Sequence, residues 1–133
     1  MQKTNLAIGD LARATGTKVV TIRYYEQAGL LPAPSRTASN YRVYDTDGLQ
    51  RLRFIRRCRD LGFGVDQIRE LLAMSENGSQ DCCAVDQIAR EHLKTVRQKI
   101  ADLGRLAHEL DRISSQCQGG TIAECRIIEA LSP

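Results

Sequence analysis

The sequence predicts a mainly helical protein, and three observations support this fold class. Aromatic residues make up 5% of the 133 residues and Trp is absent, which favours aliphatic helix packing over a sandwich or barrel. Apolar residues recur at helical spacing along most of the chain. Residues 83–116 contain no Pro and only one Gly, which predicts a helix longer than those of ordinary globular domains.

The first expected elements are two short helices joined by a tight turn. Residues 6–15 have the apolar spacing of an amphipathic helix, and Gly16 is expected to end it. Thr17 is expected to cap a second helix over 18–28, which stops at Gly29. Such a pair forms a helix-turn-helix, although an ordinary helical hairpin has the same pattern. The surface positions of the second helix carry side chains that suit phosphates and base edges: Lys18, Thr21, Arg23, Tyr24 and Tyr25.

A small two-stranded wing is expected after these helices. The prolines and serines of "LLPAPSRTASN" exclude a helix there, and Tyr41–Tyr44, "YRVY", is typical of a strand. We expect Arg36 and Arg42 to face outward from this wing. Arginine and tyrosine together on a wing suit contact with a nucleic-acid backbone.

Two further helices are predicted between the wing and a polar linker. Asp45 or Thr46 can cap a helix that runs to about Leu61, and a shorter helix covers about Val65–Met74. The inner row of the first helix is Leu49, Leu52, Ile55 and Cys58, which predicts a buried, structural thiol at Cys58. Its outer face is expected to carry five arginines: Arg51, Arg53, Arg56, Arg57 and Arg59.

Charge is unevenly distributed although the net charge is only +3. Residues 1–78 contain 12 Lys and Arg against 8 Asp and Glu, whereas residues 79–133 contain 7 against 8. Nucleic-acid binding would place a basic surplus in the first part, and a solvated helix face is the alternative.

The long helix over 83–116 carries a heptad pattern with charged residues outside the apolar rows. This pattern predicts a two-helix coiled coil. No other segment is long enough to be the partner helix, so the partner is expected to be a second copy of the chain. One row is Leu93, Ile100, Ala107 and Ser114, and the other is Val96, Leu103, Leu110 and Cys117.

Five cysteines are present, and their compartment decides how to interpret them. The chain has no apolar run long enough to span a bilayer and no signal-peptide pattern at its start, so a cytoplasmic location without membrane association is expected. In a reducing compartment, cysteines are more often metal ligands, catalytic thiols or buried hydrophobes than disulfide partners.

Two of these cysteines lie at opposite ends of the long helix. Cys82 and Cys117 are 35 positions apart, which is about 52 Å along a helix, so one chain cannot bring them into one site. An antiparallel homodimer would place Cys82 beside Cys117 and Cys125 of the other copy, whereas a parallel dimer would pair Cys82 with itself. The sequence does not fix the orientation, but convergence of three thiolates favours the antiparallel one. Three thiolates suit soft metal ions, with Cys83 as a possible further ligand.

Ile8–Leu72, with its "TIRYYE", "GLL" and "YRVY" segments, followed by the long helix, resembles the MerR family of bacterial transcription regulators. The resemblance implies an antiparallel homodimer that binds a palindromic promoter in double-stranded DNA. Metal binding then distorts the DNA so that RNA polymerase can use both promoter elements. The positions that match the DNA-contacting helix and wing of the family are Thr21, Arg23, Tyr24, Tyr41 and Arg42.

The resemblance also bears on the metal. With a cysteine at position 82, the chain resembles the family's sensors of divalent mercury, lead, cadmium or zinc, whereas its sensors of monovalent ions have serine there. The spacing of Cys117 and Cys125 is instead similar to that of copper sensors, so a copper(I) sensor is an alternative. A second alternative is a redox sensor switched by oxidation of Cys117 and Cys125. Neither histidine has the context of a catalytic site, so no enzyme is expected.

The expected organisation therefore has three parts. Residues 1–78 form a winged helix-turn-helix DNA-binding domain with its connecting helices. Residues 79–117 form the dimerisation helix, and residues 118–133 form a metal-binding loop and a C-terminal helix.

Overall fold

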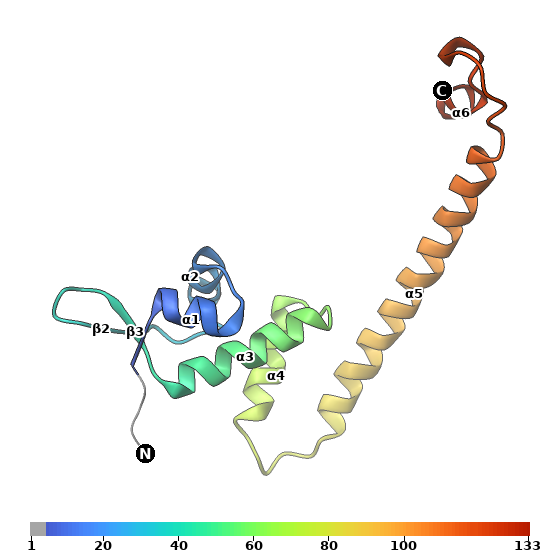
Figure 1. Cartoon of the computed structure of the whole chain (residues 1–133). Coiled ribbons are helices and arrows are strands. Elements are labelled where there is room, and N and C mark those ends of the chain that lie inside the picture. The colour runs from blue at the N-terminus through green and yellow to red at the C-terminus, as the bar shows by residue number, and fades with distance from the viewer. Residues whose placement is uncertain (1–4) are drawn as a thin grey trace. The chain divides into compact units, whose positions relative to one another are not determined.

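The computed structural model describes residues 5–133 and confirms a mainly helical fold (Figure 1). The chain divides into two compact units, one that ends at Val85 and one that covers Asp86–Pro133. Among the described residues, no helix is both long and apolar enough to cross a membrane. The helices are α1 (Ile8–Thr15), α2 (Val19–Gln27), α3 (Thr46–Asp60), α4 (Val65–Ser75), α5 (Cys83–Ser114) and α6 (Arg126–Leu131), with a short 3-10 helix, η1 (Ile122–Glu124), before α6.

Within the part of the chain that the structure describes, the sheet has three strands, not the two that the wing alone would supply. The strands β1 (Leu6–Ala7), β2 (Ser35–Arg36) and β3 (Arg42–Tyr44) are antiparallel in the order β1-β3-β2. Leu6 pairs with Tyr44, so the prediction of helix at residues 6 and 7 is wrong. The pairing of β1 with the free edge of β3 satisfies backbone hydrogen-bonding groups of both strands. The apolar spacing of residues 6–15 does not indicate this pairing, because the partner strand is distant in the sequence.

The turn between α1 and α2 follows the prediction at its glycine but not at its cap. Gly16 adopts a left-handed conformation, with φ of 63°, and ends α1 as expected. Thr17 does not cap α2, because Lys18 holds the N-cap position without a side-chain bond. The Thr17 side chain is instead buried, and its hydroxyl donates to the Thr15 carbonyl at 3.4 Å. Thr17 therefore bonds back to the last turn of α1, through its hydroxyl and its backbone N–H, instead of starting α2.

One small core joins the four helices of the first unit. The Asp45 carboxylate accepts the Gly48 N–H at 2.9 Å and starts α3 as predicted. Cys58 is buried, and burial raises the pKa of its thiol, so it packs as a neutral apolar side chain as predicted. The side chains with no exposed surface come from α1 to α4 and the turn after α2: Leu11, Ile22, Leu30, Leu52, Ile55 and Ile68.

The predicted long helix is confirmed as one unbroken element, α5 (Figure 1). Its 32 residues give a length of about 48 Å. Its heptad rows leave large apolar side chains at the surface of the single chain, among them Leu93, Ile100, Leu103 and Leu110. Leu106, which the two rows do not include, is also exposed. Pairing of this surface with a second copy remains a prediction.

The chain reverses after α5 through a glycine-containing loop. Gly119 and Gly120 have φ of 79° and 96°, a backbone conformation that residues with a Cβ rarely adopt. A Cβ at position 120 would also lie 2.7 Å from the Glu124 Oε2 atom. The Glu124 side chain is exposed and can move aside, so the loop requires Gly120 for its backbone conformation.

Candidate nucleic-acid interface and metal centre

Helix α2 presents most of its predicted contact residues to solvent. Lys18, Arg23 and Tyr24 are exposed, and Thr21 is half-buried. Tyr25 is buried, so its predicted surface position is wrong; it packs into the core beside the ring of Tyr24. The prediction missed an exposed apolar residue, Val20, 74% of whose surface is accessible. Val20 and Tyr24 are four residues apart and share one face of the helix.

The wing exposes two of its three predicted contact residues. Arg36 is exposed on β2, and its Nη1 atom donates to the Asn40 carbonyl at 3.1 Å across the turn. Tyr41 is 71% exposed. Asn40 lies between them with φ of 67°, a conformation that asparagine tolerates better than most residues. Arg36 and Tyr41 are therefore both accessible to solvent on the hairpin.

Arg42 does not face freely outward as predicted. Its Nε atom lies 3.3 Å from Oε2 of Glu26 on α2, and both side chains are largely buried. The hydroxyl of Tyr44 donates to Oε1 of the same carboxylate. Burial, followed by the hydrogen bond to Glu26, raises the pKa of Tyr44 above its ordinary value, so the phenol stays protonated as a donor. Glu26 thus joins α2 to β3, and the sequence gives no sign of this pairing.

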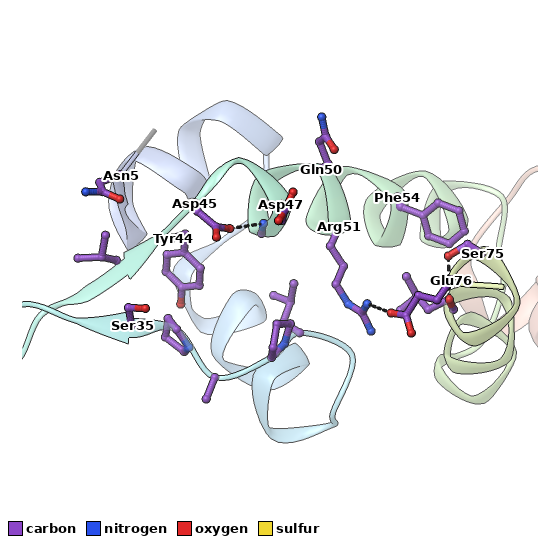
Figure 2. A pocket seen from close by; sticks show the side chains of 17 residues that line it. Asn5, Ser35, Tyr44, Asp45, Asp47, Gln50, Arg51, Phe54, Ser75 and Glu76 are labelled. Atoms are coloured by element: carbon purple, nitrogen blue, oxygen red, sulfur yellow. Dashed lines mark hydrogen bonds and ion pairs between the residues drawn. The ribbon is translucent and has the colours of Figure 1, made fainter. Parts of the chain in front are cut away.

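The arginines of α3 also separate into two groups. Arg53, Arg56, Arg57 and Arg59 are exposed as predicted. Arg51 instead turns toward the domain, where its Nε atom donates to the Leu30 carbonyl at 2.6 Å. Its Nη1 atom lies 2.5 Å from Oε1 of Glu76, as Figure 2 shows. The prediction of an outward Arg51 is therefore wrong. A long side chain can bend back to a distant carbonyl such as that of Leu30, whose position cannot be deduced from the helical periodicity of α3.

Cys82 and Cys83 lie at the start of α5, and both are exposed. The Cys83 N–H donates to Oδ1 of Asp81 at 3.0 Å. Hydrogen bonds from the side chain and then the backbone of Cys83 hold the pKa of Asp81 below its usual value. Cys83 is thus hydrogen-bonded to Asp81, two residues earlier, where α5 begins, and this bond distinguishes it from Cys82.

Cys117 and Cys125 bracket the loop that follows α5. Cys117 is exposed, and its N–H donates to the Ser114 carbonyl at 3.1 Å. Cys125 is half-buried at the junction of η1 and α6, where its N–H donates to the Ile122 carbonyl at 3.1 Å. These backbone bonds place Cys117 in the turn after α5 and Cys125 at the end of η1, and neither thiol forms a disulfide.

The donor chemistry of Cys82, Cys117 and Cys125 fits a soft metal ion. All three thiols are at least partly accessible, and thiolates are the ligands that soft ions prefer. Within residues 5–133, no three His, Cys, Asp or Glu side chains gather into a group that could hold a metal ion. Since α5 separates Cys82 from Cys117 by about 48 Å of helix, a site made from all three needs a second chain.

Comparison with known families decides the identity of the fold. The family model "MerR HTH family regulatory protein" matches residues 6–75, more than half of the chain. A second model, "MerR, DNA binding", matches residues 49–113. The chain belongs to the MerR family. The winged helix-turn-helix and long helix predicted from the sequence are therefore those of a family of transcription regulators.

Several MerR relatives match almost the whole chain. The HTH-type transcriptional regulator HmrR of Sinorhizobium medicae is 42% identical over 125 residues, which is 94% of this chain and 85% of the relative. The mercuric resistance operon regulatory protein of Bacillus cereus is 37% identical, over 93% of this chain and 95% of the relative. The crystal structure of PbrR691 from Ralstonia metallidurans, in complex with lead(II), is 38% identical with a TM-score of 0.81 and covers 96% and 99% of the two chains.

Proposed function

We propose that this protein is a metal-responsive transcription regulator that binds a palindromic promoter as a homodimer. It activates transcription when a thiophilic divalent ion binds: mercury, lead, cadmium or zinc. Activation requires that RNA polymerase use a promoter whose DNA the bound dimer distorts, so polymerase is the second macromolecular partner. A protein with this role acts where the chromosome lies, in the cytoplasm.

One observation carries the metal part of the proposal. Three accessible thiols occur at the two ends of α5 in a chain that is 38% identical to a regulator solved with lead(II). We assign Cys82 of one copy and Cys117 and Cys125 of the other as the ligands. Cys83 is the further candidate, although its N–H and its side chain both bond to Asp81 at the start of α5.

The dimer part of the proposal rests on α5. Its exposed leucines and isoleucine form an apolar surface that water disfavours, and a second copy of the helix would cover it. An antiparallel arrangement brings the start of one α5 to the end of the other, where the loop of residues 118–133 begins. The proposed division is a DNA-binding domain over 1–78, a dimerisation helix over 79–117 and a metal-binding loop and helix over 118–133.

The test is a titration of the reduced protein with mercury, lead, cadmium, zinc and copper(I). Thiolate–metal absorption and transcription from the protein's own promoter are followed together. We expect both signals to rise with at least one divalent ion. A response to copper(I) alone would make the protein a copper sensor, and a response to diamide or peroxide but to no metal would identify a redox sensor.

The wing offers a test of the DNA surface. Replacing Arg36 with alanine should weaken DNA binding equally across sequences and lower the salt dependence of binding by about one phosphate contact. Thermal unfolding should not change, because Arg36 is exposed. The matched variant Arg42→Ala should also lower the free energy of unfolding, by about 1–3 kcal/mol, because it removes a partner of the buried Glu26 carboxylate. Equal stability losses in both variants, measured by thermal melts, would refute this distinction.

A further inference from the structure

The C-terminal end of α2 is held by two arginines from the two helices that follow the wing. Arg51 on α3 donates from Nε to the Leu30 carbonyl at 2.6 Å. Arg69 on α4 donates from Nη2 to the Ala28 carbonyl, also at 2.6 Å. Backbone carbonyls beyond a helix end lack partners within the helix and carry partial negative charge. Two cationic donors at this end therefore fix the direction of α2 relative to α3 and α4.

Each arginine also pairs with an acid, but the two acids lie in different places. Asp66, the partner of Arg69, is in the first turn of α4 itself, and its side chain is 95% exposed. Glu76, the partner of Arg51, is the C-cap residue directly after the last residue of α4. From Glu76 the chain continues for six residues to Cys82. Only the Arg51 pair therefore connects the end of α2 with the segment that leads to the proposed metal ligand.

We propose that Arg51 and Glu76 are positioning residues that couple the segment before Cys82 to the recognition helix α2. The guanidinium of Arg51 is planar and presents donors along different edges, so Nε can hold Leu30 while Nη1 holds Glu76. A displacement of residues 76–82 reaches Arg51 first and, through it, the end of α2. This inference rests on the function proposed above.

The two contacts of Arg51 differ in solvent exposure: its ion pair with Glu76 is exposed, whereas its bond to the Leu30 carbonyl is partly buried. The Glu76 side chain is 64% exposed and lies at the edge of an open groove of about 780 Å³, between the start of α3, the end of α4 and the loop after α2 (Figure 2). An ion pair exposed in this way is worth little in stability, so it can break and re-form without unfolding the domain. The Arg51 side chain is only 27% exposed. Arg51 therefore keeps its hold on α2 while its bond to Glu76 changes.

The central experiment uses the full-length protein with Glu76→Gln, which removes the charge and keeps the shape. The matched control is Asp66→Asn, which removes the charge that pairs with Arg69, the second arginine that bonds to the end of α2. Four quantities are measured for each variant: metal affinity, DNA affinity without metal, thermal unfolding and the ratio of transcription with metal to transcription without it. We expect Glu76→Gln to lower the ratio about fivefold or more, the lower end of ordinary coupling between sites, and to leave the other three unchanged. Asp66→Asn should leave all four unchanged.

Conservative variants separate coupling from simple support. Glu76→Asp keeps the charge and should retain most of the transcription ratio. Arg51→Lys keeps the charge but replaces the planar fork, whose Nε and Nη1 atoms bond the two partners separately, with one compact ammonium, so it should lower the ratio as Glu76→Gln does. If Glu76→Gln instead weakens DNA binding equally with and without metal, or leaves the ratio intact while the wild-type protein responds, the coupling role is wrong. If the wild-type protein itself shows no metal response, the proposed function fails, independently of Glu76.

Discussion

Replacing Cys82 with serine is expected to abolish the transcriptional response to divalent metal while DNA binding is retained. Loss of even an outer partner of a metal ligand weakens metal binding by about 10- to 100-fold, so loss of a thiolate ligand should cost at least the upper figure. DNA binding should persist, because Cys82 is exposed at the start of α5 and belongs to no packed core. Cys83→Ser is the matched control, and we expect it to keep the metal response. Metal titrations and promoter binding on the same preparations measure both effects.

Mixed dimers test whether the ligands come from two chains. One chain carries Cys82→Ser and its partner carries both Cys117→Ser and Cys125→Ser. With ligands shared between chains, this dimer keeps one complete site and should bind one metal ion where the wild-type dimer binds two. Ligands drawn from one chain would leave no site, and metal binding would then be lost entirely. Loss of DNA binding in the Cys82→Ser protein would show instead that this cysteine is structural.

Replacing Leu103 with glutamate on α5 is expected to separate the dimer and, with it, high-affinity binding to a two-part promoter site. The side chain is 64% exposed in the single chain, so the change should not disturb the helix itself. Burying a leucine contributes about 1.5–3 kcal/mol, and a symmetric dimer loses two. The dissociation constant of the dimer should therefore rise by more than about 100-fold, with a further rise from burying charge. Sedimentation equilibrium measures the constant directly.

Ala101→Glu is the control for this prediction. It introduces the same charge two residues earlier, at an exposed position outside the heptad rows. We expect this variant to remain dimeric and to bind the promoter normally. A dimer that survives Leu103→Glu would place the interface elsewhere than on the predicted rows of α5.

The sequence predicted those features whose causes are local. The heptad rows located α5, and the apolar row of α3 correctly buried Cys58. Gly16 ended α1 because a left-handed residue there is a local requirement. Each of these signals repeats along one helix or lies within a few residues, where backbone geometry determines the outcome.

The missed features depend on residues that are distant in the chain. β1 pairs with β3, almost 40 positions later, and this pairing overrides the helical spacing around Leu6. Arg42 and Arg51 were expected to face solvent because their periodic positions are outward. A long flexible side chain can nevertheless reach Glu26 or the Leu30 carbonyl once the fold brings them near. Periodicity gives the direction of a Cβ atom, whereas the destination of a guanidinium depends on tertiary structure.

The shared carboxylate of Glu26 has a mechanical consequence. Because Arg42 and Tyr44 both bond to it, α2 and the wing are tied together, which keeps Val20 and Tyr24 on α2 at a set spacing from Arg36 and Tyr41 on the hairpin. In the homodimer that we propose, this spacing would be set before DNA is bound. A change in promoter geometry would then appear as a rotation of one DNA-binding domain against the other, or as twist in the DNA between them.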